Sequence, residues 1–182
     1  MEHVSRRHFC LAPAATLSLF SSATPAQTAA FEAPNIVPIS ARLVTSGQPS
    51  PAALAQLGTQ GFGAVVYLAP PTVPDAVRNE AAILERQGIA YVNIPIRFDN
   101  PTEEHFASFV EVLSELSDRK ILVHCQVNMR ASTMVFLHRV IVGKESPEQA
   151  YEAVARVWSP QGPWKALLVT LLRKHQVAFE PY

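Results

Sequence analysis

Residues 120–132 read Lys-Ile-Leu-Val-His-Cys-Gln-Val-Asn-Met-Arg-Ala-Ser. The first five residues have an apolar centre, Ile121–Val123, which is typical of a buried strand. A short loop begins at Cys125, and Arg130 opens a second apolar stretch that continues to Val142. That stretch has almost no polar face, so it predicts a helix buried at the centre of the domain.

The chain on either side repeats this alternation of strands and helices. Further strands are predicted at Ala64–Leu68 and Ile89–Ile94, and a short strand or β-hairpin over residues 36–46. Helices are predicted from Ser50-Pro51 to Gly58 or Gly61, over about 76–87, from Asn100-Pro101-Thr102-Glu103 to Leu116, from Ser146-Pro147, and around 164–172. The expected fold is therefore α/β, with a central, mostly parallel sheet of about four or five strands flanked by helices.

Length and composition restrict the class of protein. The 182 residues suffice for one domain, and 15 basic residues balance 15 acidic ones. A neutral chain gives no reason to expect a nucleic-acid partner. No spacing of His, Cys and acidic residues matches a metal site, and no cofactor is expected.

The first thirty residues predict an export signal. Residues 5–11 read Ser-Arg-Arg-His-Phe-Cys-Leu, and the apolar run that follows is too short to span a bilayer. Small residues come next, and they offer cleavage after Ala26 or Ala30. The segment resembles a twin-arginine signal, which implies a periplasmic protein with no other membrane segment; a basic tail is the alternative. Cleavage would remove Cys10 and leave Cys125 as the one cysteine of the mature chain.

An unpaired thiol in an oxidising compartment is a liability unless it is buried or used. The N-terminus of a helix offers free N–H groups and positive potential, which bind anions and favour a thiolate. Arg130 can grip two oxygens of an oxyanion at once. The loop contains no glycine, and Asn128 is the residue in it that best tolerates a positive φ.

These residues carry a family resemblance. The run from His124 to Ser132 resembles the phosphate-binding loop of the cysteine-based protein tyrosine and dual-specificity phosphatases. It resembles more closely the phosphatase-like domains that are found joined to β-lactamase-like hydrolases. The similarity extends to four other segments: Thr45–Pro49, Val65–Leu68, Ile94-Pro95 and Asn100–Thr102.

The resemblance implies a role for each residue of the loop. Cys125 would be the nucleophile, Arg130 the phosphate clamp and Ser132 a hydroxyl that helps the phosphocysteine leave, while His124 would orient the loop. The cradle would be formed by the backbone amides of Gln126, Val127, Asn128, Met129 and Arg130. The implied partner is a phosphorylated small molecule or a phosphoprotein.

One departure from the phosphatase pattern leaves other functions open. Arg130 follows Cys125 by five positions, whereas most such phosphatases have six. The shorter spacing is similar to that of rhodanese sulfurtransferases, although those usually have Arg directly after Cys, where this chain has Gln126. The remaining alternatives are an oxyanion-binding module without catalysis and an inert buried thiol.

A phosphatase of this kind also needs a proton donor for the leaving group. Asp99, just after the strand that ends at Ile94, is the candidate, with a helix cap as its alternative role. Glu103, Glu104 and His105 are expected to complement the dipole of the following helix. Asp75 is expected to cap the helix predicted over 76–87.

Overall fold

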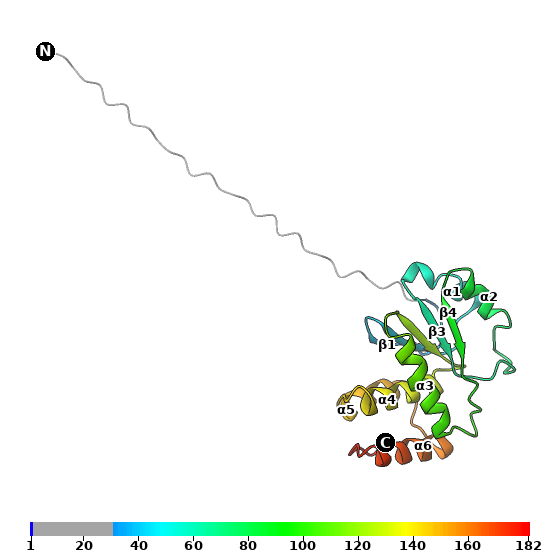
Figure 1. The fold of residues 1–182 in the computed structure, drawn as a ribbon, viewed down its shortest axis with the longest axis vertical. Coiled ribbons are helices and arrows are strands. Elements are labelled where there is room, and N and C mark those ends of the chain that lie inside the picture. The colour runs from blue at the N-terminus through cyan, green and yellow to red at the C-terminus, as the bar shows by residue number, and fades with distance from the viewer. Residues whose placement is uncertain (2–30) are drawn as a thin grey trace.

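The computed structural model describes Met1 and residues 31–182. The predicted export signal lies outside the described residues, which appear in colour in Figure 1. Within the described part of the chain, no helix is long and apolar enough to cross a membrane.

Five strands form one sheet. They are β1 (Val37–Ser40), β2 (Leu43–Ser46), β3 (Ala64–Tyr67), β4 (Ala90–Asn93) and β5 (Ile121–His124). Their order across the sheet is β1-β2-β5-β3-β4. β1 and β2 pair antiparallel as the predicted hairpin, and every other pairing is parallel. The predicted α/β fold with a mostly parallel sheet is confirmed.

The helices follow the predicted order. They are α1 (Pro51–Leu54), α2 (Glu80–Glu85), α3 (Glu103–Glu115), α4 (Met129–Ile141), α5 (Pro147–Ala155) and α6 (Gly162–Lys174), with a 3₁₀ turn, η1, at Gly58–Gln60. Of these, α1, α2 and α3 are shorter than predicted, and α6 is longer. The prediction of a helix from residue 76 is wrong, because α2 starts at Glu80. Ala76 and Glu80 each donate to the carbonyl three residues back, at 3.1 and 3.0 Å, so this stretch forms separate turns.

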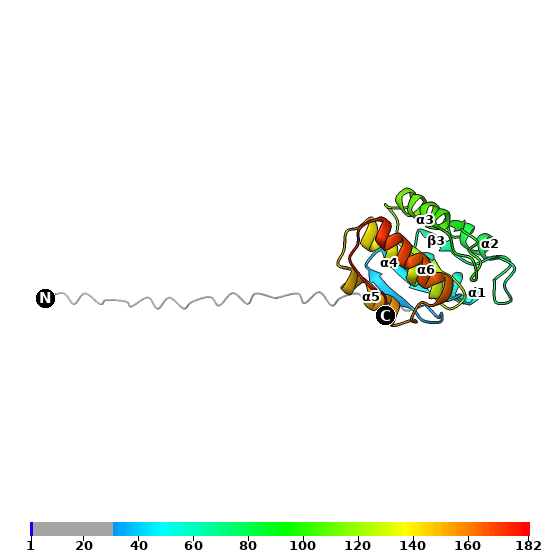
Figure 2. The ribbon, with the colours of Figure 1, turned by 90° about the horizontal axis from the view of Figure 1, so that it is seen from below.

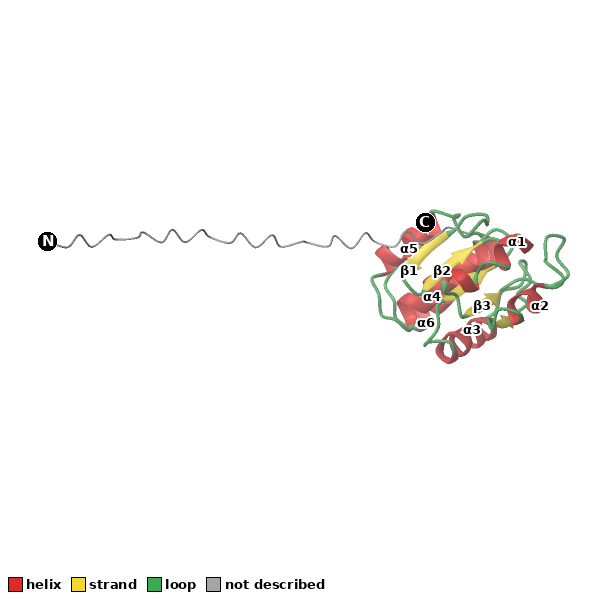
Figure 3. Cartoon of the chain, turned by 90° about the horizontal axis from the view of Figure 1, so that it is seen from above, coloured by secondary structure: helices red, strands yellow, loops and turns green. Residues whose placement is uncertain are grey.

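The two faces of the sheet carry two separate apolar cores. Alternate residues of a strand point to opposite faces, so Val66 and Val123 pack with α3 to α6 while Val65 and Leu122 pack with α1 and α2. Figure 1 shows α1 and α2 apart from the larger group of helices, and Figure 2 shows α6 beside α4. α4 lies against the sheet and contacts both α5 and α6, which confirms the predicted central helix (Figure 3).

This topology brings the ends of four strands to one edge of the sheet. In the register of the sheet, Ser46 and Tyr67 both lie beside His124, and Tyr67 lies beside Asn93. The loops that follow β2, β3, β4 and β5 therefore leave the sheet together. Such an edge is where open parallel sheets place their ligand sites.

Candidate active site

The loop after β5 starts at Cys125, whose side chain is fully buried. Its backbone N–H donates to the carbonyl of Ser46 at 3.3 Å, so the loop begins still attached to the end of β2. The loop ends at Asn128, which has a φ of 72°. This is the left-handed conformation that the sequence indicated for Asn128 in place of a glycine.

Two neighbouring segments donate hydrogen bonds to backbone carbonyls on the outer side of the loop. The backbone N–H of Gln48 donates to the carbonyl of Gln126 at 3.0 Å. The side-chain amide of Asn35 donates to the carbonyl of Val127, also at 3.0 Å. Across a trans peptide the carbonyl and the next N–H point in opposite directions. The N–H of Val127 is therefore turned away from Gln48, as an anion cradle requires.

The side chain of Asn128 fastens the end of the loop to the sheet. Its Nδ2 donates to the backbone carbonyl of Asn35 at 2.6 Å and to the hydroxyl of Thr45 at 3.0 Å. Both the side chain of Asn128 and that of Thr45 are buried. The first N–H groups of a helix have no partner within the helix, and Asn128 makes no side-chain capping bond to those of α4.

Arg130 is buried at the first turn of α4. Its Nε donates to the carbonyl of Ile96 at 3.0 Å, and its guanidinium carbon lies 5.1 Å from the centre of the Phe98 ring. Both terminal nitrogens contact a single acceptor, the side-chain oxygen of Gln126, at 3.4 and 3.3 Å. The fork of the guanidinium thus faces the loop and holds a weakly bound neutral oxygen.

Gln126 also links the loop to the segment after β3. Its Nε2 donates to Oδ1 of Asp75 at 2.8 Å. The expectation that Asp75 caps a helix is wrong, because α2 begins five residues later, at Glu80. Asp75 instead faces the residue that follows Cys125.

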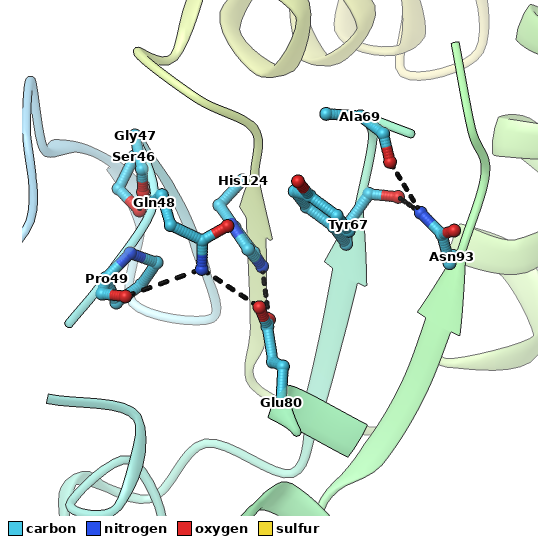
Figure 4. A network of polar contacts seen from close by, with 9 residues as sticks. All are labelled: Ser46, Gly47, Gln48, Pro49, Tyr67, Ala69, Glu80, Asn93 and His124. Carbon is cyan, nitrogen blue, oxygen red and sulfur yellow. Dashed lines mark hydrogen bonds and ion pairs between the residues drawn. The ribbon is translucent and has the colours of Figure 1, made fainter. Parts of the chain in front are cut away.

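Sequence reasoning missed Glu80. This glutamate is buried at the start of α2, where its carboxylate contacts Nε2 of His124 at 2.6 Å and Nε2 of Gln48 at 2.9 Å (Figure 4). The signal was present in the sequence, since Glu80 shares a helical face with the buried Ile83 and Leu84. An acidic residue on the apolar face of a helix indicates a buried polar partner.

Asp99 lies on the exposed loop after β4 and pairs with Arg97. The guanidinium donates to both carboxylate oxygens of Asp99, at 3.0 and 2.6 Å. These hydrogen bonds hold the pKa of Asp99 below its usual range. Asp99 does not cap α3, because that helix is capped by Thr102. The neighbouring Phe98 is held by a 2.9 Å hydrogen bond from the indole of Trp164 to its carbonyl.

The other candidates of the sequence lie in the first turns of helices. Ser132 is buried and donates to the carbonyl of Met129 at 3.2 Å. Glu103 pairs with Lys174 at 2.5 Å. His105 forms a capping box with Thr102. A hydrogen bond from Thr102 lowers the pKa of Glu104. Among the described residues, no group of three His, Cys, Asp or Glu side chains is placed to hold a metal ion.

A family model matches most of the chain. The model describes a DSP-PTPase phosphatase fused to NAD+ kinase, and it matches residues 20–163. The chain belongs to this phosphatase family.

Individual relatives agree with this DSP-type phosphatase assignment. The chain is 30% identical over 112 residues to a β-lactamase hydrolase-like protein of Xylella fastidiosa, and the match covers 60% of this chain and 26% of that protein. A DUF442 phosphatase from Shewanella putrefaciens CN-32 shares 25% identity with a TM-score of 0.72, covering 79% of this chain and 94% of the other. Tk-PTP has the same fold, with 21% sequence identity and a TM-score of 0.61. The match covers 80% of this chain and 99% of Tk-PTP. The predicted resemblance to phosphatase-like domains joined to β-lactamase-like hydrolases is confirmed.

Proposed function

We propose that this protein hydrolyses phosphate monoesters through a phosphocysteine intermediate. The sulfur of Cys125 attacks phosphorus, the bond from phosphorus to the leaving oxygen breaks, and water then hydrolyses the thiophosphate ester. The observation that carries the proposal is the arrangement of the loop: buried Cys125 lies at its start, and its carbonyls are held outward by Gln48 and Asn35.

Arg130 supplies the clamp in this proposal. Two oxygens of a phosphate replace the single side-chain oxygen of Gln126 on the guanidinium fork, because a bidentate pair with a charged acceptor is stronger than a shared neutral one. The bond from Nε to the carbonyl of Ile96 keeps the plane of the guanidinium fixed during this exchange. Gln126 remains attached to Asp75 and moves with the loop that follows β3.

Asp99 is the proposed proton donor to the leaving group, and Ser132 the proposed hydroxyl that assists the second step. The support for Asp99 is its neighbour Phe98, whose ring lies over the Arg130 guanidinium at the mouth of the loop. To donate a proton, Asp99 has to leave Arg97, because that pairing favours the carboxylate form.

The test of the proposal is hydrolysis of an aryl phosphate by the full-length chain. Cys125→Ser and Arg130→Ala are expected to abolish turnover, while Arg156→Ala, at the exposed C-cap of α5, leaves it unchanged. Cys125-dependent transfer of sulfur from thiosulfate to cyanide, with no phosphate release, would contradict the proposal and indicate a sulfurtransferase.

We propose in addition that residues 1–30 direct the protein to the periplasm, where the substrate is a phosphorylated small molecule or a phosphoprotein. The support is the pair Arg6-Arg7 followed by a short apolar run and small residues. Replacing both arginines with lysine is expected to keep the protein in the cytoplasmic fraction of a bacterial host. Unchanged recovery from the periplasmic fraction would contradict the assignment.

A further inference from the structure

Glu80 is a buried carboxylate for which the proposed reaction has no use. Only 3% of its surface is exposed, although it lies at the first residue of a six-residue helix whose other end is exposed. Burying a carboxylate costs several kcal/mol unless hydrogen bonds compensate for the lost water. Both oxygens of Glu80 have such a partner, and the two partners lead to the same place.

The first oxygen holds the residue before Cys125. Oε1 of Glu80 lies 2.6 Å from Nε2 of His124, and the His124 side chain is fully buried. The imidazole also stacks on the ring of Tyr67, with 4.7 Å between ring centres. Among residues 31–182, the other ring nitrogen of His124, Nδ1, is buried without a partner. Within that part of the chain, Glu80 therefore provides the one polar contact of the His124 side chain.

The second oxygen holds the residue after Cys125, through one intermediary. Oε2 of Glu80 accepts from the side-chain amide of Gln48 at 2.9 Å. The backbone N–H of the same Gln48 donates to the carbonyl of Gln126 at 3.0 Å. Figure 4 shows His124 and Gln48 converging on the carboxylate from two different strand ends.

We propose that Glu80 is a positioning residue for the active-site loop, an inference that rests on the proposed phosphatase function. Its two oxygens fix the chain on both sides of Cys125, at His124 directly and at Gln126 through Gln48. The orientation of the Gln126 carbonyl sets that of the next N–H, which belongs to the cradle. Glu80 thus determines where the sulfur and the cradle amide of Val127 lie relative to each other, without touching the substrate.

The experiment compares Glu80→Ala and Glu80→Gln in the full-length chain, with Glu85→Gln, an exposed glutamate on the same helix, as control. The first readout is the phosphate concentration that half-protects Cys125 from iodoacetamide, measured on the Cys125 peptide by mass spectrometry. The second is kcat and KM for an aryl phosphate. Melting temperatures of all variants are recorded alongside.

Glu80→Ala is expected to raise the half-protecting phosphate concentration about tenfold, the effect of losing one hydrogen bond to a charged group. It should lower kcat about 10²-fold, as a misplacement of roughly 1 Å does. Glu80→Gln should restore most of both. The new amide can accept from His124 and donate to Oε1 of Gln48, which is buried without a partner in the wild-type chain.

Two results would overturn the inference. One is a folded Glu80→Ala with the phosphate protection and kcat of the control. The other is a Glu80→Gln variant that is as impaired as Glu80→Ala. That result would show that the loop requires the negative charge of Glu80 and not its two hydrogen bonds. If Glu80→Ala does not fold, Gln48→Ala cuts one tie alone and is expected to weaken phosphate protection. Protection of Cys125 by phosphate can be measured without turnover. Failure of the proposed phosphatase function is therefore a separate result, in which the wild-type chain releases no phosphate from the aryl phosphate.

Discussion

Asn128 illustrates how one residue can meet two structural requirements. Its backbone takes the left-handed conformation that ends the loop, and its side chain binds both Asn35 and Thr45. A glycine would satisfy the first requirement more easily but would leave the second unmet. The sequence indicated the conformation, because Asn is the best non-glycine residue there. It did not indicate the partners, which are more than 80 residues away in the chain.

Substitution of Asn128 separates these two contributions. Asn128→Gly removes the buried hydrogen bonds and should lower the free energy of unfolding by about 1–3 kcal/mol. Asn128→Ala loses the same bonds and also strains the backbone, so we expect it to be about 1 kcal/mol less stable still. Urea unfolding followed by circular dichroism measures both. An Ala variant as stable as the Gly variant would contradict the role given to the positive φ.

Asp99 and Asp75 both lie on loops at this edge of the sheet, and the sequence predicted Asp99 as the candidate proton donor. If Asp99 is the proton donor, Asp99→Asn should slow alkyl phosphates about 10²–10⁴-fold more than activated aryl phosphates, because only the former need the proton. Asp75→Asn is the matched comparison, and its effect should not depend on the leaving group. The reverse pattern would transfer the role to Asp75, which faces Gln126.

Arg97 should set the pH dependence of proton donation by Asp99. Its hydrogen bonds lower the pKa of Asp99, so removing them raises this pKa. A general acid must be protonated, and activity on alkyl phosphates therefore falls as pH rises through its pKa. In Arg97→Ala the fall should occur at higher pH than in the wild-type chain. A shift to lower pH would contradict the assignment of Asp99.

At the scale of elements, the loop is shaped by the segment that follows β2 as much as by its own residues. Gly47 bridges to Val127, and its N–H donates to the carbonyl of Pro34 at 2.6 Å. A Cβ atom on Gly47 would lie 2.8 Å from the carbonyl oxygen of Gln126 and 2.8 Å from Cβ of Pro34. The close approach of these two backbones requires glycine.

Gly47→Ala is therefore expected to displace the loop. Overpacking of this kind costs about 1–3 kcal/mol in the free energy of unfolding. A displacement of roughly 1 Å should lower kcat about 10²-fold. The control is Gly58→Ala, whose new Cβ meets the end of the flexible Gln87 side chain. Wild-type kinetics in Gly47→Ala would show that the loop does not depend on this contact.

The sequence predicted the elements around the loop better than their contacts. Apolar runs and glycine stops predicted β3, β4, β5 and the buried helix α4, because burial and turns leave local signatures. The start of α2 was placed too early, since residues 76–79 have helix-compatible composition but form turns. Cys125 and Arg130 lie at the start of the loop and in the first turn of α4, as the sequence predicted. The contacts of Glu80 with Gln48 and His124 were not predicted, because they join segments far apart in the chain.

At the scale of the whole molecule, three tyrosines make the free energy of unfolding depend on pH in the alkaline range. Burial is the main cause that raises the pKa of Tyr67, Tyr91 and Tyr151 above the ordinary value near 10. Nearby negative charge adds to this effect, from Asp75 at Tyr67 and from Glu80 at Tyr91. The folded chain thus keeps protons that the unfolded chain loses.

The contribution of these tyrosines to stability should accordingly be constant below about pH 10 and fall above it, because the unfolded state loses these protons at lower pH than the folded state does. Tyr91→Phe is expected to make that fall less steep, because it removes one of the three hydroxyls whose pKa is raised. Melting temperature as a function of pH measures the effect. A Tyr91→Phe curve parallel to that of the wild-type chain would show that burial of this hydroxyl does not contribute.

The most direct test of the central claim is whether Cys125 becomes phosphorylated during turnover. The full-length chain is mixed with an aryl phosphate, quenched in acid after a short time, digested and analysed by mass spectrometry. We predict one phosphoryl group on the sulfur of Cys125, absent from Cys125→Ser and reduced in Arg130→Ala. Phosphate release with an unmodified Cys125 at every quench time, or an added sulfur atom on Cys125 after exposure to thiosulfate with no phosphate release, would contradict it.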